Sequence, residues 1–244
     1  MRHLRASGAC LALVILAGCA GAKTKEAVVS STREGKTTSE SGDSAAKRGK
    51  SLVRFVNAVP DQALDLTTED RATFVNVGFK DVTPYTEIGD NLVKFRVRAN
   101  DGDSVLATNT ETMLDGHRYT VIAMQKDDGK LDVKVVRDEV LPEPGKARIR
   151  VIQAAPGLSD VDVALSGQKD LVFDNVKYGS EAGFKDVTPA TATLEFRLGD
   201  PPHVTVPLRL KTLSLKADRA YTLVIVGAKP TEIQAISFND AVRP

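Results

Sequence analysis

The chain has 244 residues, of which 42% are hydrophobic, 27% are charged and 5% are aromatic, and it contains no tryptophan. Its formal net charge is +1 at pH 7, and the two signs are interspersed, so the chain lacks the strongly basic balance typical of nucleic-acid binding. The length allows one or two domains of ordinary size, and we exclude nucleic acid as a partner.

The N-terminus predicts a lipoprotein signal peptide over residues 1–18. Residues 1–5 are short and basic, and residues 6–15 are apolar but too few to span a bilayer as a permanent helix. The next residues, Leu16-Ala17-Gly18-Cys19, resemble the lipobox of bacterial lipoproteins. This resemblance implies that Cys19 is lipidated and becomes the first residue of the mature chain. The alternative is an ordinary secretory signal that happens to hold a cysteine.

Residues 19–50 are expected to form a disordered tether behind the lipid. They lack aromatic residues and hydrophobic periodicity, so they cannot bury enough apolar surface to offset their ordering entropy. Two or more acyl chains would hold the protein on a membrane effectively permanently. Because Ala20, and not aspartate, follows Cys19, analogy with other lipoproteins favours the outer membrane if the cell has two membranes. The mature chain keeps no second cysteine, which excludes a disulfide and thiol catalysis.

A duplication organises the rest of the chain. The hexapeptide Phe-Lys-Asp-Val-Thr-Pro occurs at residues 79–84 and again at 184–189, residues 53–60 match 149–156, and residues 118–121 match 220–223. Matching positions lie about one hundred residues apart, which predicts one β-rich module written twice. We expect module 1 over residues 51–140, a proline-rich and extended linker over 141–146, and module 2 over 147–244.

Within each module, short strands and frequent turns predict a sandwich of two antiparallel sheets. Residues 92–98 alternate apolar and basic side chains, as expected of a strand with one face in water. Tyr119 and Tyr221 each open a late strand, as in the tyrosine corner of immunoglobulin-like sandwiches, where the hydroxyl bonds to upstream backbone. The predicted fold is therefore all-β, with two tandem immunoglobulin-like antiparallel β-sandwich domains.

The order of these motifs resembles the bacterial domain of unknown function 4397. The shared features are Val-Arg-Phe-Val-x-Ala-x-Pro-Asp, a central Val-Thr-Pro-Tyr, an alternating strand and Leu-x-Gly-x-x-Tyr-Thr-Val. The resemblance covers residues 52–242 and is stronger in module 1. It implies an extracellular immunoglobulin-like module, often repeated and often found on lipoproteins, without an established activity. A histidine common in the family is Asn57 here and Gln153 in the second copy, and the glycine expected near Thr68 is present only as Gly167.

Residues that could carry chemistry are few. The mature chain has two histidines, His117 and His203, and neither has metal-ligand spacing, so we predict no metal site and no cofactor. The aspartate pairs Asp65 with Asp162, and Asp81 with Asp186, are expected at equivalent places in the two modules. Paired carboxylates could perform glycosidic acid–base work, but a turn or cap that each copy needs explains the repetition better. We therefore predict that the protein is not an enzyme.

Two functions stay open. The first is a lipid-anchored, non-catalytic envelope lipoprotein that binds another envelope protein or serves as a structural or adhesive element, through sheet edges and loops. The alternative is a glycan- or cell-wall-binding lipoprotein. Sugar-binding platforms usually need aromatic rings, and with Tyr119 and Tyr221 assigned to the corners, Tyr85 and Tyr178 remain. The sequence assigns no ligand-binding residue.

Overall fold

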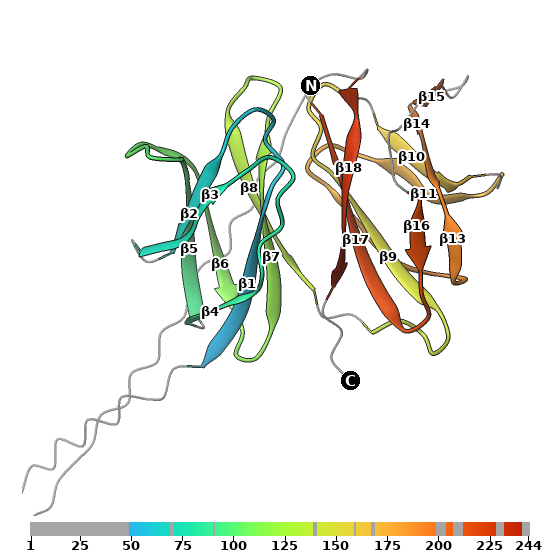
Figure 1. Cartoon of the computed structure of the whole chain (residues 1–244), viewed down its shortest axis with the longest axis horizontal. Coiled ribbons are helices and arrows are strands. Elements are labelled where there is room, and N and C mark those ends of the chain that lie inside the picture. The colour runs from blue at the N-terminus through green and yellow to red at the C-terminus, as the bar shows by residue number, and fades with distance from the viewer. Residues whose placement is uncertain are drawn as a thin grey trace, which may run out of the picture. The chain divides into compact units, whose positions relative to one another are not determined.

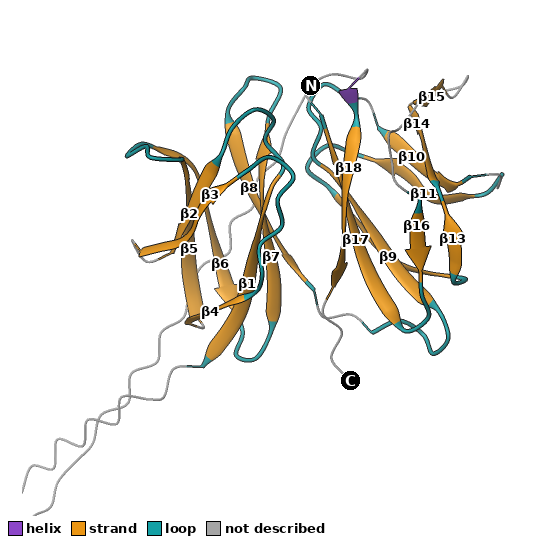
Figure 2. Ribbon diagram, viewed as in Figure 1, coloured by secondary structure: helices purple, strands orange, loops and turns teal. Residues whose placement is uncertain are grey.

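The structure, a computed structural model, describes residues 49–68, 71–89, 91–138, 141–158, 160–166, 169–198, 204–206, 212–227 and 232–240. All of them belong to one compact unit. This part of the chain consists of strands and loops, with a short 3-10 piece at Glu232 and no α-helix (Figure 1; Figure 2). It contains no helix that could span a membrane. The predicted signal peptide, Cys19 and the tether as far as residue 48 lie outside the described residues.

The first eight strands form two four-stranded sheets, in the orders β4-β1-β7-β8 and β3-β2-β5-β6. Alternation along β5 explains their packing, because Val93, Phe95 and Val97 point into the core while Leu92 and Lys94 face outward. The strands are β1 (Lys50–Asn57), β2 (Leu64–Thr68), β3 (Arg71–Val77), β4 (Thr86–Gly89), β5 (Asn91–Ala99), β6 (Val105–Met113), β7 (Arg118–Gln125) and β8 (Leu131–Arg137).

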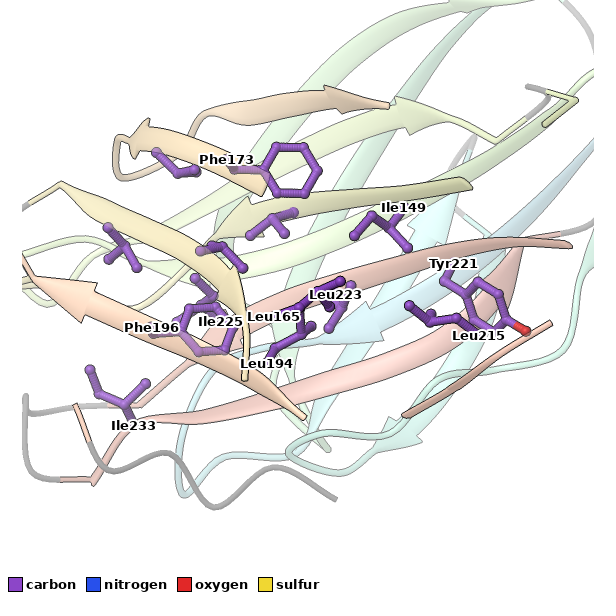
Figure 3. Packing of buried hydrophobic residues seen from close by; sticks show 14 of the residues in the cluster. Ile149, Leu165, Phe173, Leu194, Phe196, Leu215, Tyr221, Leu223, Ile225 and Ile233 are labelled. Atoms are coloured by element: carbon purple, nitrogen blue, oxygen red, sulfur yellow. The ribbon is translucent and has the colours of Figure 1, made fainter. Parts of the chain in front are cut away.

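The remaining strands repeat this architecture, with sheets β12-β9-β17-β18 and β11-β10-β14-β15 and a two-stranded sheet β13-β16. Their core is mainly aliphatic, with Phe173 and Phe196 among its largest side chains (Figure 3). The strands are β9 (Ala147–Gln153), β10 (Val161–Leu165), β11 (Leu171–Val176), β12 (Glu181–Val187), β13 (Ala190–Ala192), β14 (Leu194–Leu198), β15 (Val204–Val206), β16 (Leu213–Leu215), β17 (Arg219–Val226) and β18 (Gln234–Asp240). The prediction of two tandem β-sandwiches is confirmed.

The named strands pair antiparallel except at one place in each module. The first strand of a module runs parallel to its tyrosine-corner strand, β1 beside β7 and β9 beside β17. The register is equivalent in the two modules, since Val53 faces Tyr119 and Ile149 faces Tyr221. The duplicated sequence thus places the same residues on matching strands.

The repeated hexapeptide, however, does not mark equivalent positions. Val82 of the first copy bridges Val56, whereas the residue opposite the matching Ile152 is Glu181, which precedes the second copy. Lys80 and Gly179 are the true counterparts, because both have positive φ and donate a backbone hydrogen bond at 2.8 Å, Lys80 to Asn57 and Gly179 to Gln153. The prediction based on the hexapeptide was wrong in register, and the duplication is carried by the strands.

The linker also differs from the extended joint that its prolines predicted. Lys146 donates a backbone hydrogen bond of 2.9 Å to the Glu143 carbonyl, and Gly145 adopts a φ of 76°. The Gly145 amide donates to Asp218 Oδ1 at 2.8 Å. The segment therefore makes a turn against module 2, because carboxylates near it accept its free amides.

Candidate functional site

Asp65 and Asp162 occupy equivalent positions, as predicted, and both have a backbone role. Asp65 Oδ1 accepts the Asn76 amide at 2.7 Å, and Asp162 Oδ1 accepts the Asn175 amide at 2.8 Å. Both asparagines have positive φ, at 51° and 56°, at a register shift in the β2–β3 and β10–β11 pairings. Each aspartate thus fixes an irregularity that its module needs.

Asp81 and Asp186 are not equivalent, which corrects the prediction. Asp81 Oδ2 accepts the Gly78 amide at 3.0 Å, closing a loop. Asp186 lies in β12 and forms a two-bonded ion pair with Arg148. That guanidinium holds the pKa of Asp186 below its usual range. The counterpart of Asp81 is Ser180, because the Asp81 amide donates to the Gly78 carbonyl and the Ser180 amide donates to the Lys177 carbonyl, each at 3.0 Å.

The two tyrosine corners are present. Tyr119 Oη accepts the Leu114 amide at 3.1 Å, and Tyr221 Oη accepts the Lys216 amide at 2.9 Å. The Tyr221 hydroxyl also donates to the Ser214 carbonyl at 3.1 Å. Both tyrosines are buried. They pin the loop before the strand and are not free to bind a ligand.

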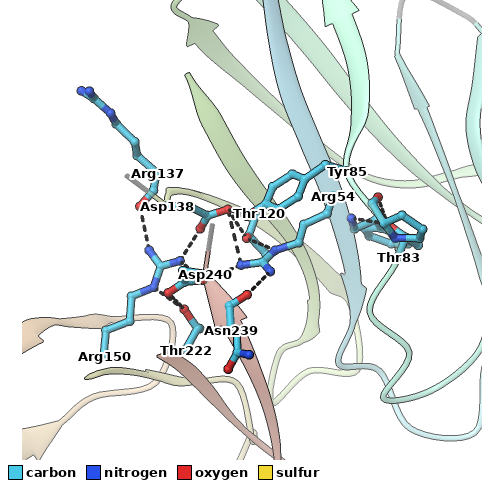
Figure 4. A network of polar contacts seen from close by, with 12 residues as sticks. Arg54, Thr83, Tyr85, Thr120, Arg137, Asp138, Arg150, Thr222, Asn239 and Asp240 are labelled. Carbon is cyan, nitrogen blue, oxygen red and sulfur yellow. Dashed lines mark hydrogen bonds and ion pairs between the residues drawn. The ribbon is translucent and has the colours of Figure 1, made fainter. Parts of the chain in front are cut away.

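A buried polar network joins the two sandwiches, and it is the most specific side-chain constellation in the described residues (Figure 4). In module 1, Arg54 Nε donates to Thr120 Oγ1 at 2.8 Å, and Thr120 donates to Asp138 Oδ2 at 2.6 Å. Arg54 also crosses to module 2, where Nη2 donates to Asp240 Oδ1 at 2.5 Å. Its Nη1 donates to the Asn239 carbonyl at 2.9 Å.

Module 2 makes the equivalent contacts to module 1. Arg150 Nε donates to Thr222 Oγ1 at 2.7 Å, and Thr222 donates to Asp240 Oδ2 at 2.6 Å. Arg150 crosses to module 1 in turn, with Nη1 on the Arg137 carbonyl at 2.9 Å and Nη2 on Asp138 Oδ1. The arginine of each module therefore donates to the aspartate of the other module, as in a two-fold symmetric interface. This network is named the reciprocal network below, and its six side chains are Arg54, Thr120, Asp138, Arg150, Thr222 and Asp240.

The chain positions these residues through strand alternation. In β1, Val53 and Phe55 point into the sandwich, so Arg54 and Val56 point out of its other face. That face is nonetheless buried, as is the outer face of β7, where Thr120 and Ile122 are fully covered. A strand buried on both faces needs a second layer over it. Module 2 supplies that layer.

Apolar side chains continue the same interface. Val56, Ile122 and Met124 of module 1 belong to one buried cluster with Ile152 and Val224 of module 2. Further members of this cluster are Ala58, Val136, Ala154, Val226 and Ile236, with Phe79, Val82 and Phe238 packed against it. Polar contacts flank the cluster, including Lys80 Nζ on Gln234 Oε1 at 2.8 Å and Lys134 Nζ on the Gly179 carbonyl at 2.9 Å.

The surroundings of the two arginines are less symmetric. The Arg54 guanidinium lies over the rings of Tyr85 and Phe238, at 4.7 and 4.2 Å from their centroids. Arg150 lies over the ring of Phe184 at 4.7 Å and pairs with Glu181 at 3.1 Å. Such stacking lets a guanidinium be buried with its charge still compensated.

Burial and charge set the electrostatics of the reciprocal network. Burial opposes the charged form of Arg150, but Asp240, Asp138 and Glu181 outweigh it and raise the pKa of Arg150. Burial raises the pKa of Asp240 above its ordinary value, and the two arginines offset only part of this increase. Burial and the Asp138 carboxylate, which accepts the Tyr85 hydroxyl at 2.7 Å, raise the pKa of Tyr85 far above its usual range. Two arginines and two aspartates thus compensate one another away from water.

Other candidate sites are small or lie outside the described residues. A recess of about 260 Å³ lies beside the β7–β8 turn, between the two modules, lined by Gln125, Lys126, Asp127, Gly129, Pro156 and Gly157. The described residues hold no group of three or more His, Cys, Asp or Glu side chains placed to bind a metal. His117 contributes its carbonyl to the Leu52 amide at 2.9 Å, and His203 lies outside the described residues.

The aromatic side chains are engaged in packing. All eight phenylalanines and four tyrosines are described, and each is buried or half-buried. Tyr178, left open as a sugar-binding ring, donates its hydroxyl to the Gln125 carbonyl at 2.8 Å across the modules. Tyr85 is held by the reciprocal network. The structure therefore places both remaining tyrosines at the module interface.

Sequence reasoning did not find the reciprocal network, although its signal was in the repeats. An arginine interrupts the apolar first strand at Arg54 and Arg150, and threonine follows each corner tyrosine. Asp138 and Asp240 end the two modules at matching places. A charged residue repeated within a strand that is otherwise apolar indicates a buried partner.

The fold and the interface define a tandem β-sandwich protein. The family model described as Domain of unknown function (DUF4397) matches residues 51–164 and residues 150–244. The chain belongs to this family, which confirms the resemblance in its motifs.

A search of curated proteins gave no match. Among solved structures, the chain is similar to the crystal structure of CBMbc (family CBM26) from Eubacterium rectale Amy13K in complex with maltoheptaose. The identity is 11% and the TM-score 0.22, with 79% of this chain and 97% of that chain covered. A likeness of this size carries no argument about function.

Proposed function

We propose that the protein is a non-catalytic lipoprotein of the bacterial cell envelope that acts as a protein-interaction, structural or adhesive module. Its lipid on Cys19 would hold it on a membrane, the outer one in a cell with two membranes. The two sandwiches would act as one rigid element behind a tether. Function then depends on the surface of the paired modules and not on an enclosed active site.

The reciprocal network carries this proposal. Its charged groups are the kind that catalysis uses, yet Arg54, Arg150, Asp138 and Asp240 are each at most 4% exposed. Their donors and acceptors are directed at one another across the interface. Buried ionic groups arranged in this way specify how two elements pack. A module pair fixed in this way suits a protein that presents a surface at a set geometry.

The anchor is tested by metabolic labelling with a radioactive fatty acid. We expect the full chain to incorporate the label and to sediment with membranes, and Cys19→Ala to lose both properties. Cys10→Ala is the matched control, because it also removes a cysteine but from the segment expected to be discarded, and it should keep the label. Equal labelling of wild type and Cys19→Ala would contradict the anchor.

The interaction role is tested by photo-crosslinking the full chain in intact cells. Recovery of one envelope protein at near-stoichiometric yield, lost when the interface of the two modules is disrupted, is the expected result. An enzyme would instead show turnover that Asp65→Asn or Asp162→Asn abolishes with the fold intact. We expect those variants to lose stability only, since both aspartates hold backbone amides.

A further inference from the structure

The face that each module turns toward the other carries both a charged donor and a charged acceptor. Module 1 presents Arg54 and Asp138, and module 2 presents Arg150 and Asp240 in the equivalent arrangement (Figure 4). When the same patch serves on both sides of an interface, the patch itself defines its partner. The face of module 1 therefore fits the face of a module 2 whether or not the two belong to one chain.

The apolar part of the interface has the same property. Val56 lies opposite Ile122 in the pairing of β1 with β7, and Ile152 lies opposite Val224 in the pairing of β9 with β17. All four belong to the shared apolar cluster. The members of this cluster and of the reciprocal network all lie outside residues 141–146, the linker. The contacts that hold the modules together are thus made by the modules alone.

Contacts at the border of the interface favour module 2, and not a second module 1, as the partner of module 1. The Tyr178 hydroxyl donates to the Gln125 carbonyl at 2.8 Å across the modules. Its counterpart in module 1 is Phe79, which precedes Lys80 as Tyr178 precedes Gly179. Phenylalanine has no hydroxyl to donate. A pair of two module 1 faces would therefore lose this hydrogen bond.

The linker is held against module 2 by a few exposed hydrogen bonds. Besides the two bonds that form its turn, the Glu143 amide donates to Asp186 Oδ1 at 3.4 Å, and the Asp218 amide donates to the Lys146 carbonyl at 2.7 Å. Residues 143–145 are exposed. Water can replace such bonds at a modest net cost, and the two prolines of the linker favour an extended conformation. The linker can therefore open without uncovering either core.

Gly145 decides how readily the linker turns back. Its φ of 76° lies in the left-handed region, which glycine adopts freely and other residues adopt only under strain. Among the described residues, none but its chain neighbours lies within 4 Å of the place where a Cβ would stand. A larger residue here would thus meet backbone strain and no clash, and the strain would disappear once the linker is extended.

We propose that two copies of the chain exchange modules, so that module 1 of each copy packs against module 2 of the other. The exchanged pair keeps the contacts of the interface and differs from two closed chains in its linkers and in the entropy of association. In dilute solution the closed chain prevails, because linked modules meet at a high effective concentration. Copies crowded on one membrane by a lipid anchor would exchange more often. That setting rests on the proposed function, whereas the exchange itself can be tested without a membrane.

The test uses full chains in which Cys10 and Cys19 are replaced by alanine, so that each copy carries one introduced cysteine. One copy has Lys80→Cys and the other has Gln234→Cys, at side chains whose Nζ and Oε1 atoms lie 2.8 Å apart across the modules. Closed chains keep these cysteines on separate molecules, whereas exchange places them side by side. We expect a short bismaleimide reagent to join the mixed copies into a covalent dimer, in a yield that rises with protein concentration.

Gly145→Val should raise the association constant of the dimer about 25-fold or more, because each of its two linkers escapes a strain worth a factor of about 5 to 30. Sedimentation equilibrium measures this constant. Gly129→Val is the matched control, since Gly129 has a φ of 81° and equally open surroundings within the part of the chain that the structure describes. It lies in the β7–β8 turn, which the closed and exchanged arrangements share, so the constant should change less than about twofold.

A single chain that carries both Lys80→Cys and Gln234→Cys should cross-link internally, which shows that the reagent spans the contact. Absence of the covalent dimer from the mixed copies at every concentration, also with Gly145→Val, would overturn the proposal. Cross-linking of Lys80→Cys to Asp132→Cys on another copy would overturn it too, because Asp132 is the module 1 counterpart of Gln234. Failure of exchange alongside intact Cys19-dependent anchoring would refute this inference and leave the proposed function standing.

Discussion

Arg54 and Arg150 are the residues whose burial most needs explanation. A buried guanidinium is costly unless its charge and its donors are satisfied. Each arginine meets this condition with a threonine of its own module and with an aspartate and a carbonyl of the other. The result is specific orientation rather than large net stability, since buried ion pairs roughly balance their own desolvation.

Replacing Arg150 by methionine should lower the free energy of unfolding by about 3–5 kcal/mol, because the Asp138 carboxylate is left buried without its main partner. Urea denaturation of the full chain measures the change. Arg54→Met should behave similarly, since its contacts are equivalent. Arg197→Met, a half-buried arginine on the outer face of module 2, is the control and should cost less than about 1 kcal/mol. A similarly small loss of unfolding free energy for Arg150→Met would contradict the idea that Arg150 compensates the buried charge of Asp138.

Tyr178 provides a test by pH. Burial, followed by the nearby Asp132, Asp127 and Asp128 carboxylates, raises its pKa to about 12, from an ordinary value of 10.0. The folded state therefore holds this proton more tightly than the unfolded chain. Its contribution to stability should be complete below about pH 10 and lost as the pH rises through about 12.

Alkaline titration of phenolate absorbance in wild type and Tyr178→Phe isolates this group. The difference between the two curves should show one ionisation near pH 12. An ionisation near the ordinary value of 10.0 in the difference curve would show that Tyr178 is exposed and that its bond to Gln125 is not formed in solution.

At the scale of the elements, β7 and β17 are the centre of the molecule. Each is buried along nearly its whole length, with one face in its own sandwich and the other against the second module. The corner tyrosine at the start of each strand holds the loop that leads into that strand. Both strands therefore serve two cores at once, which explains their near-continuous apolar sequence.

Tyr221→Phe should lower the free energy of unfolding by about 1–2 kcal/mol, since the Lys216 amide loses its acceptor and the Ser214 carbonyl its donor. Thermal or urea unfolding measures the loss, and hydrogen exchange at the Lys216 amide should accelerate. Ser237→Ala, which also removes one hydroxyl but at an exposed position of β18, is the control and should be neutral. An unchanged exchange rate at the Lys216 amide would contradict the hydrogen bond from this amide to Tyr221 Oη.

The sequence predicted the strands and the corners because alternation and turn residues are local signals. It could not predict the reciprocal network, since that depends on which faces of two separate sandwiches meet. The repeated hexapeptide gave a wrong alignment of the two modules for a related reason. Equivalent positions are defined by strand pairing, in which Val56 lies opposite Val82 and Ile152 lies opposite Glu181, and six identical residues do not reveal that pairing. Asp65 and Asp162 were placed correctly because the strand that carries each of them is preserved in both copies.

For the whole molecule, the interface makes two sandwiches into one unit. Its apolar cluster and its reciprocal network both contain residues from the two modules. Short-linked modules of this kind meet at a high effective concentration, so even a moderate interface stays formed. A rigid pair holds the surfaces of the two modules in a fixed orientation relative to each other.

Calorimetry should therefore show one cooperative unfolding transition for the full chain, with calorimetric and van't Hoff enthalpies in agreement. The double variant Arg54→Met with Arg150→Met should split the transition in two, because each sandwich keeps its own core while the shared layer is lost. Two transitions already in the wild type would mean that the modules unfold independently.

The most direct measurement is the distance between the modules in solution, by double electron–electron resonance. Spin labels would be attached at Thr110→Cys on β6 and Ser214→Cys on β16, both exposed, in a full chain with Cys10 and Cys19 replaced by alanine. A single narrow distance distribution that broadens in the Arg54→Met, Arg150→Met variant is the expected result. A broad distribution in the wild type would contradict the rigid pairing of the two sandwiches.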